Sequence, residues 1–518
     1  MTAETYKIGK NILENLTSGM YTDSKFIYRE YVQNSADAID EAVRQNIIDK
    51  QNAKILININ SQSRTITIED NATGITQDNA ISLLGNVADS MKDKNINKGF
   101  RGIGRLGGLA YCKKLVFETS TAGEDVKSVM SWDADLLHKI LNDPSDKSNA
   151  ATVIDRIVDL KTEKENIDEH YFKVSLINVK ESNNDLLDKD AIREYLSQVA
   201  PVDFNKTIFL LSGKIREEMA AHNKSLDTYN IFINDDSIYK IYQNSLIDTN
   251  GTCYDKISDI DYHEFYNNSG ELLAWSWVGI SKFDKCIPEK NNPQRCIRLK
   301  KSNIQLGDAD TLSFLHKETR GNGYFIGEVH AIHPKLIPNA RRDYFNNNET
   351  LLELEAKLRE YFNNLYNLYH LANDQKNAIK KQNEYITKKQ EYEEKTQTGS
   401  FVNAEEQQKE LKRLEELKSN AEKAKKISEN IAKKAEENKV LKNVVTFIKK
   451  DYGNNLEEIP EIQVDLNQGG KKVYRSNKLN KLNREQRKLI SKVYDILNQV
   501  LDPDTAECVK KKIEEEFS

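Results

Sequence analysis

Two short segments near the start of the chain alternate apolar and polar residues in the way that half-buried strands do. They read "AKILININ" (53–60) and "RTITIED" (64–70), and alternate side chains of a strand point to opposite faces. Before them, residues 24–48 place apolar side chains at the steps of an amphipathic helix. Further strands are predicted for "KLVFETST" and "YFKVSLINV". Since strands and helices do not follow a regular βαβ rhythm, we predict a sheet covered by helices on one face.

A second set of strand patterns lies between residues 216 and 345, which we assign to a second α/β domain. Its predicted strands are "YNIFIN", "LLAWSWVGI", "CIRLKKSNIQLG" and "YFIGEVHAI". From residue 346 onward, apolar residues keep helical steps in a highly charged chain. We therefore predict a first α/β domain (1–215), a second or middle domain (216–345), a helical or coiled-coil region (346–450) and a small helical element (451–518).

The helical region has consequences for assembly. A helix over residues 404–445 would be roughly 60 Å long at 1.5 Å per residue. Such a rod is too long to be buried by its own domain, so we expect it to meet a partner helix or a second subunit. The C-terminal helices therefore predict a homodimer. Residues 482–517 are predicted to form two helices separated at "LDPDTA".

Composition and charge restrict the class of protein. The 518 residues are 30% charged and 38% hydrophobic with a net charge of -5, so the net charge does not indicate a nucleic-acid partner. A local basic patch is still compatible with that balance. The five cysteines show no CxxC spacing, which favours a reducing cytoplasm over a disulfide framework or a thiolate zinc site. The sequence has no signal peptide pattern and no long apolar run, so we expect no membrane segment.

The helix over residues 24–48 carries a stripe of polar residues within "REYVQNSADAID". Glu30, Asn34, Asp37 and Glu41 are separated by four, three and four residues, which places them on one side of an α-helix. For an isolated helix, a solvated polar face is the ordinary explanation. The motifs that follow in the chain favour a functional face instead.

The segment "IEDNATGIT" ends a predicted strand with Asp70, and Gly74 follows four residues later. A carboxylate at a strand end can accept a hydrogen bond from an exocyclic amine, and a nearby glycine allows a flat base to approach the backbone. An ordinary Asx turn that closes a strand is the alternative interpretation.

The segment "KGFRGIGRLGGLAYC" is rich in glycine. Gly99, Gly102 and Gly104 can leave backbone N–H groups directed at a phosphate, with the dipole of a following helix behind them. No GK[ST] follows, so this is not a Walker loop, and no strand directly precedes it as in a dinucleotide fingerprint. Taken alone, a flexible loop would be the default interpretation.

Together and in this order, the three motifs resemble those of the GHKL ATPase superfamily, which includes gyrase B, the ninety-kilodalton heat-shock chaperone, histidine kinases and MutL. The resemblance is closest to the heat-shock chaperone of the HtpG type, whose pattern R-E-x-x-x-N-x-x-D-A is reproduced by residues 29–38. It covers about residues 5–120 and fades beyond. It implies an α+β protein with an N-terminal Bergerat-type ATPase domain, a middle domain and a helical C-terminal region.

The resemblance also implies roles for individual residues. Glu30 would be the general base for the water that attacks the γ-phosphate, and Asn34 would hold Mg²⁺. Asp70 would bind the adenine amine. The full set of implied ATP-binding residues is Arg29, Asn34, Asp37, Asp70, Gly74, Gly99, Gly102, Ile103 and Gly104. Ala72 replaces a glycine of the chaperone pattern, so we expect slow turnover.

The middle domains of these ATPases send a cation back to the γ-phosphate, so that hydrolysis depends on domain closure. In this chain the loop "IPNARRDYF" offers Arg341 and Arg342. Adjacent arginines usually point in opposite directions, so we expect at most one to reach the nucleotide. Pairing of these arginines with Asp343 or nearby glutamates is the alternative, and Lys300 and Lys301 are weaker candidates for the same role.

The resemblance favours an ATP-hydrolysing dimeric clamp that acts on a protein client, as a compact relative of the chaperone. A second hypothesis is an ATPase switch of a DNA-processing or phage-defence system, similar to MORC and MutL proteins, which works with a partner effector. A third is a nucleotide-binding scaffold with negligible turnover. Fold alone does not choose among them.

Overall fold

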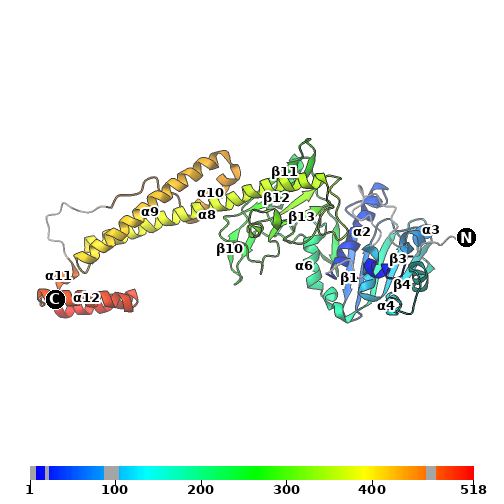
Figure 1. Ribbon diagram of the computed structural model, residues 1–518, viewed down its shortest axis with the longest axis horizontal. Coiled ribbons are helices and arrows are strands. Elements are labelled where there is room, and N and C mark those ends of the chain that lie inside the picture. Colours follow the sequence, from blue (N-terminus) through cyan, green and yellow to red (C-terminus); the bar gives the residue numbers. More distant parts are fainter. Residues whose placement is uncertain (1–7, 18–22, 87–103, 463–473) are drawn as a thin grey trace. The chain divides into compact units, whose positions relative to one another are not determined.

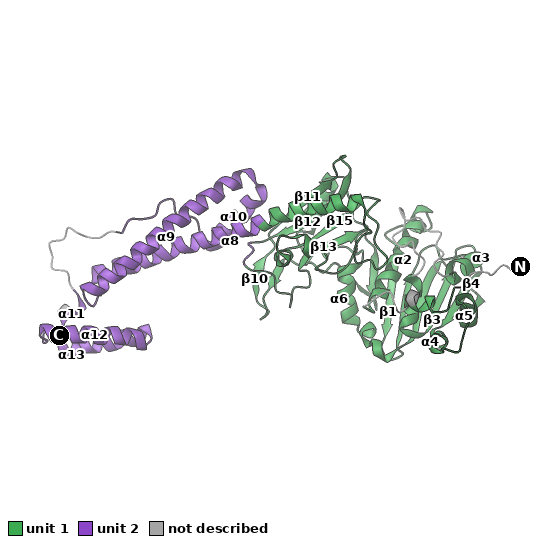
Figure 2. Ribbon diagram, viewed as in Figure 1, with its two compact units in different colours: residues 1–281, 285–366 green, residues 282–284, 367–518 purple. Residues whose placement is uncertain are grey.

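The structure is a computed structural model that describes residues 8–17, 23–86, 104–462 and 474–518. The chain divides into two units, coloured green and purple in Figure 2. Unit 1 comprises residues 1–281 and 285–366, and unit 2 comprises residues 282–284 and 367–518. The predicted motifs all belong to unit 1.

The N-terminal sheet of unit 1 has eight strands within the described part of the chain. Neighbouring strands are antiparallel except β1 and β7, which run parallel. In sheet order the strands are β5 (Val158–Lys164), β4 (Val126–Asp133), β3 (Cys112–Ser120), β6 (Tyr171–Val179), β2 (Thr65–Asp70), β1 (Lys54–Asn60), β7 (Asn230–Ile233) and β8 (Asp236–Ser237).

Helices pack on one face of this sheet (Figure 1). In β1, Ile55, Ile57 and Ile59 are buried while Lys54 and Asn58 are exposed, as the alternating pattern predicted. The isoleucines join one core with apolar side chains of the helices, which confirms a sheet covered on one face. The helical elements here are α1 (Ile12–Thr17), α2 (Phe26–Arg44), α3 (Gln77–Ala80), η1 (Ile81–Gly85), η2 (Gly104–Ala110), α4 (Ala134–Asn142), α5 (Ala150–Ile157), η3 (Glu181–Leu187) and α6 (Lys189–Val199).

Strand β7 corrects one expectation about the second domain. The segment "YNIFIN", which we predicted to belong to the second α/β domain, forms β7 and pairs with β1 of the first sheet. Ile231 and Ile233 are buried in the first core, so hydrophobic burial outweighs proximity in sequence here. The first sheet therefore extends past residue 215. The remaining domain boundaries stay predictions.

The second sheet of unit 1 contains five strands in the described residues. In sheet order they are β11 (Asp259–Tyr266), β12 (Leu272–Ile280), β15 (Ile326–Ala331), β13 (Cys296–Lys301) and β14 (Ile304–Gln305). Trp275 and Trp277 of β12 are buried in its core, as expected of apolar residues on a covered strand. The region also contains α7 (Ser212–Ala221), the β9–β10 pair (Ser245–Ile247 and Cys253–Lys256), η4 (Ser313–Leu315) and η5 (Thr319–Tyr324).

Unit 2 is helical, as predicted. Helix α8 (Glu349–Thr398) begins in unit 1 and ends in unit 2, where α9 (Ala404–Glu437) runs beside it (Figure 2). Tyr385 and Tyr392 of α8 share a buried cluster with Leu414 and Ala421 of α9, so α9 finds its partner helix in its own chain.

The predicted continuous helix over residues 404–445 is interrupted. Asn438 leaves the helical conformation, and its side chain accepts a hydrogen bond from Leu441 N, which caps α10 (Lys439–Tyr452). The remaining helices are α11 (Arg475–Lys478), α12 (Arg484–Val500) and α13 (Pro503–Phe517). Asp502 caps α13 with a proline at its first turn, which confirms the predicted break between the last two helices.

Candidate functional site

Helix α2 carries the polar stripe predicted from the sequence. Its apolar residues Ile27, Val32, Ala36 and Ile39 are buried in the first core and fix the rotation of the helix about its axis. Glu30 is 8% exposed and Asp37 is 3% exposed, so these carboxylates do not lie on a solvated face. Asn34 is half-buried, and its side chain makes no hydrogen bond to a described residue. The ordinary explanation is therefore wrong for Glu30 and Asp37, while Glu41 at the end of the stripe is partly exposed.

Asp70 lies at the end of β2, where the sheet pairs it with Ile55 of β1. The residue is 1% exposed, and its Oδ1 accepts a hydrogen bond from the backbone N–H of Ala72 at 3.2 Å. The Asx turn that we considered as an alternative is thus present. It occupies one carboxylate oxygen and does not by itself account for the burial of an acidic side chain.

The backbone conformation and the close approach of β3 require a glycine at position 74. Its φ is +64°, and a Cβ atom there would lie 1.8 Å from the carbonyl oxygen of Ser120 at the end of β3. The following N–H, of Ile75, donates to Thr119 Oγ1 at 2.8 Å. Close approach to β3 is a reason for the glycine that the sequence did not reveal. A role beside a base stays a prediction.

The glycine-rich segment is described only from Gly104 onward, so Gly99, Gly102 and Ile103 lie outside the described residues. Gly104 begins η2 directly over α2, where a Cβ atom would lie 2.2 Å from Glu30 Oε2. A side chain at this position would force the Glu30 carboxylate to move. The structure therefore places the end of the glycine segment against the predicted general base.

Tyr31 is a residue of this region that the sequence reasoning missed. Its hydroxyl donates to the carbonyl of Arg105 at 2.9 Å and accepts the N–H of Gly108 at 3.2 Å. Burial raises the pKa of Tyr31 well above its ordinary value, so the hydroxyl keeps its proton and its donor role. Tyr31 thus fastens η2 to α2 one residue after Glu30. The only signal in the sequence was a tyrosine, an aromatic residue with a hydroxyl group, directly after the predicted base Glu30.

The loop between β15 and α8 brings a cation to the same carboxylate. Arg342 Nε lies 3.1 Å from Glu30 Oε1, and the two side chains are 11% and 10% exposed. Arg341 is exposed and forms no ion pair with a described residue. The two arginines therefore point in different directions, as expected, and it is Arg342 that contacts Glu30. The alternative pairing with Asp343 does not occur in the described residues, since Asp343 binds Asn339 instead.

Arg29 is directed at the second sheet. Its Nη1 donates to the carbonyl oxygen of Gln305 at 3.4 Å, and its guanidinium lies 4.0 Å from the centre of the Phe26 ring. The structure thus gives Arg29 a contact with β14, while its predicted role in nucleotide binding stays a prediction. Lys300 lies beside Glu328 and donates to the carbonyl of Gln198, and Lys301 donates to the carbonyl of His333. Because both lysines are bound elsewhere, they are no longer candidates for reaching the nucleotide.

Gln33 is a second residue that the sequence reasoning missed. It lies on the same stripe of α2, three residues after Glu30 and four before Asp37, and is 1% exposed. Neither atom of its amide has a hydrogen-bond partner among the described residues. A buried amide without partners costs about 1–3 kcal/mol for each unsatisfied group. The side chain is therefore suited to bind a ligand or an enclosed water.

These residues fit the substrate and the metal ion that the resemblance implies. The glycine backbone beside Glu30, the unpartnered amide of Gln33 and the accessible amide oxygen of Asn34 are suitable groups for phosphates and a hard cation. Within the described residues, no group of three or more His, Cys, Asp or Glu side chains forms a metal site of its own. Mg²⁺ would thus depend on Asn34 together with oxygens of the substrate.

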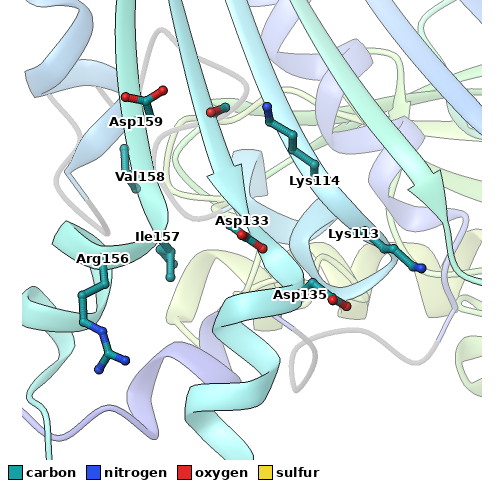
Figure 3. A pocket seen from close by; sticks show the side chains of 9 residues that line it. Lys113, Lys114, Asp133, Asp135, Arg156, Ile157, Val158 and Asp159 are labelled. Atoms are coloured by element: carbon teal, nitrogen blue, oxygen red, sulfur yellow. The ribbon is translucent and has the colours of Figure 1, made fainter.

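A separate hollow of about 400 Å³ lies beside β3, β4 and β5 (Figure 3). None of the predicted site residues lines it. Two of its charged groups have structural partners, since Arg156 pairs with Asp146 at 2.7 Å and Asp133 accepts a hydrogen bond from Leu136 N at the start of α4. The lining residues are Lys113, Lys114, Ser131, Asp133, Asp135, Arg156, Ile157, Val158 and Asp159.

Comparison with known proteins adds an independent line of support. Residues 21–159 match the family model described as histidine kinase-, DNA gyrase B- and HSP90-like ATPase. The chain is 30% identical to the chaperone protein HtpG of Burkholderia lata over 144 residues, which cover 24% of this chain and 23% of the relative. It is 28% identical to the HtpG proteins of Burkholderia ambifaria and Burkholderia cenocepacia over the same length and shares.

The similarity therefore spans about a quarter of the length of these curated relatives. In the part of the chain that the structure describes, no helix combines the length and apolar character needed to cross a membrane. The matched residues contain α2, the β1–β2 hairpin and η2, which are the elements that carry the stripe, Asp70 and Gly104. Residues 21–159 therefore match a GHKL-type ATPase domain, and this N-terminal ATPase domain is similar to the matching part of the HtpG chaperones.

Proposed function

We propose that this protein is a Mg²⁺-dependent ATPase that works as a molecular clamp, with ATP bound between α2 and the glycine-rich segment. The observation that carries the proposal is the ion pair between Arg342 and Glu30. A loop that follows the second sheet delivers a cation to the helix of the first sheet. An ATPase built in this way can hydrolyse its substrate only when the two α/β regions are correctly placed, which is the property that a clamp needs.

Glu30 acts as the general base in this proposal. Its carboxylate accepts the proton of the attacking water, and the backbone of Gly104 lies close beside this carboxylate. Arg342 supplies positive charge where negative charge develops on the γ-phosphate. In the described structure Arg342 instead neutralises Glu30, so binding of the γ-phosphate must draw the guanidinium away and leave the carboxylate available. Mg²⁺, when bound at Asn34, would offset phosphate charge.

Asp70 fixes the other end of the substrate. The buried carboxylate accepts a hydrogen bond from the exocyclic amine of adenine, which selects adenine over a base with a carbonyl at that position. Gly74 and the turn after Asp70 keep the backbone close to the end of β3 and so shape this side of the pocket. Replacement of a glycine by Ala72, which is completely buried, makes the turn more crowded and is consistent with slow turnover.

We further propose a homodimer that acts on a protein client, as a compact relative of the HtpG chaperones, in the cytoplasm. The similarity to the relatives is confined to the ATPase domain and covers 24% of this chain. The same restriction favours a second candidate function, an ATPase switch that serves a partner effector in DNA processing or phage defence. Salt-dependent DNA binding that responds to ATP would select the second candidate, and rescue of an aggregating client would select the first.

Two variants test the ATP site directly. Asp70→Asn replaces an acceptor with a donor and should abolish ATP binding measured by calorimetry. Glu30→Ala should retain ATP binding and lower kcat by about 10²–10⁴-fold, the usual contribution of a general base. Asp135→Asn, which alters the hollow of Figure 3, is the matched control and should change neither measurement. Normal ATP hydrolysis by Glu30→Ala would show that the base has been assigned wrongly.

A further inference from the structure

The ion pair between Arg342 and Glu30 requires two regions of unit 1 to meet in a fixed register. The contacts that bear on this register are made by the β13–β14 hairpin, at the edge of the second sheet. Ser302 and Asn303 form its tight turn with φ of +50° and +58°. Strand β14 places Gln305 next to α2 of the first sheet, where it receives the hydrogen bond from Arg29.

Arg298 of β13 is the buried centre of these contacts. The residue is 3% exposed, and its Nη1 donates both to Gln305 Oε1 and to Gln198 Oε1 at 3.1 Å. Gln198 lies in α6, a helix of the first core. Within the described residues Arg298 forms no ion pair with a carboxylate, so its charge is bound by neutral oxygens. A planar guanidinium with fixed donor directions determines the relative orientation of the amides it binds.

A second contact reinforces the first. Lys300, two residues further along β13, is 1% exposed and donates to the backbone carbonyl of Gln198. Its ammonium also lies 3.6 Å from Glu328 Oε1. The C-terminal turn of α6 is thus held by two side chains from the same face of one strand. This fixes β13 against the first sheet at a point remote from Glu30 in sequence.

The hairpin then reaches both members of the ion pair. The carbonyl of Gln305 accepts the hydrogen bond from Arg29, the residue before Glu30. Two residues later, the N–H of Gly307 donates to the carbonyl of Arg342 at 2.9 Å. Gly307 has φ of +62°, and a Cβ atom there would lie 2.7 Å from the carbonyl of Asp343, so only glycine permits this approach. The side chain of Gln305 also donates to the carbonyl of Gly307 at 3.2 Å.

We infer that Arg298 and Gln305 are positioning residues for ATP hydrolysis, because they set the loop of Arg342 in register with Glu30. Arg298 orients Gln305 against α6, and the Gln305–Gly307 segment carries this register to Arg29 on one side and to Arg342 on the other. The inference rests on the proposed function of Arg342 and Glu30. A purely structural role would predict lower stability alone, whereas a positioning role predicts a loss of kcat that depends on Arg342.

The test compares Gln305→Leu and Arg298→Lys with Lys301→Met in the full chain. Gln305→Leu keeps the backbone carbonyl that binds Arg29 but removes the acceptor of Arg298, and Arg298→Lys keeps the charge but loses the forked geometry. Lys301→Met is the control, because Lys301 lies on the same strand as Arg298, and its side chain donates only to His333 O among the described residues. The measurements are kcat and KM for ATP, the Kd of a non-hydrolysable ATP analogue, and the thermal unfolding midpoint.

We expect kcat to fall by about 10- to 100-fold in Gln305→Leu, the effect of a small misplacement of a reacting group, while the Kd of the analogue changes by less than about twofold. The kcat of Arg298→Lys should lie between that of Gln305→Leu and that of the wild type. In an Arg342→Ala background, Gln305→Leu should cause no further loss of kcat, because both changes act through the same guanidinium. Lys301→Met should retain wild-type kcat.

Each contrary outcome has a separate meaning. Wild-type protein without ATP turnover would overturn the proposed function and this inference together. If Arg342→Ala loses activity while a correctly folded Gln305→Leu keeps wild-type kcat, the inference alone is wrong. The same conclusion follows if the losses from Gln305→Leu and Arg342→Ala multiply, since Gln305 would then act independently of Arg342.

Discussion

Unit 1 contains two groups of buried polar side chains that differ in how completely they are satisfied. In the second sheet, Glu328 is the centre of a closed cluster: Lys240 Nζ lies 2.7 Å away, Lys300 Nζ 3.6 Å and His330 Nε2 3.0 Å, and Trp277 Nε1 donates at 3.2 Å. Burial by itself would raise the pKa of Glu328, but the two lysines hold it well below its ordinary value.

On α2, the buried polar side chains are only partly satisfied. Gln33 is as buried as Glu328, yet its amide has no partner among the described residues, and Glu30 is held by a single arginine from another region. A cluster that satisfies itself stabilises the fold, because each of its polar groups already has a partner. A stripe with remaining hydrogen-bonding capacity can bind a ligand without first breaking internal contacts. The difference supports the proposal that the stripe of α2 is the functional face and that the Glu328 cluster is structural.

The largest expected effect tests the structural half of this comparison. Glu328→Leu removes the carboxylate and leaves Lys240 and Lys300 buried without a counterion, which should lower the free energy of unfolding by about 3–5 kcal/mol. Glu118→Leu is the matched control on the open face of the first sheet, where the pairs with Lys127 and Lys173 are 3.9 and 3.7 Å long and partly exposed. Glu118→Leu should lower the free energy of unfolding by no more than about 1 kcal/mol.

Denaturant unfolding monitored by circular dichroism measures both changes. Equal losses in Glu328→Leu and Glu118→Leu would contradict the view that the closed cluster stabilises the fold.

The next effect tests the functional half. Arg342→Ala removes the cation that contacts Glu30 and should lower kcat by about 10²–10³-fold, as expected for loss of charge stabilisation in a transition state. Arg341→Ala should leave kcat unchanged, since Arg341 is exposed and forms no ion pair with a described residue. Steady-state phosphate release measures both variants. A larger loss in Arg341→Ala than in Arg342→Ala would reverse the assignment of the arginine.

The smallest effect concerns the side chain that marks the difference between the two groups. Gln33→Leu replaces an unsatisfied buried amide with an apolar side chain of similar size, so it should raise the free energy of unfolding by about 1 kcal/mol or more. The same change should weaken ATP binding or lower kcat. Thermal unfolding with and without ATP measures the changes in stability and in ATP binding, because stabilisation of the native state by a ligand increases with the logarithm of its affinity.

Unchanged stabilisation by ATP in a stabilised Gln33→Leu protein would show that Gln33 fills space beside the substrate without binding it. The outcome would weaken the argument from unsatisfied groups while leaving Glu30 and Arg342 in place.

The sequence by itself determined the features that depend on neighbouring residues. The steps between Glu30, Asn34 and Asp37 predicted one helical face, alternation predicted the β1–β2 hairpin that ends at Asp70, and the turn at Asp502 was visible from its cap and proline. These features follow from helical periodicity, strand alternation and turn chemistry, which act over a few residues. The order of the motifs was then sufficient to recognise the ATPase family.

Only the tertiary structure decided which distant segments meet. The pairing of β7 with β1, the choice of Arg342 over Arg341, and the packing of α9 on α8 each join residues far apart in the chain. No local preference distinguishes two adjacent arginines, and a strand pattern does not name its neighbour in a sheet. Such choices are made by burial of shared apolar surface and by satisfaction of buried charges, which are properties of the whole fold.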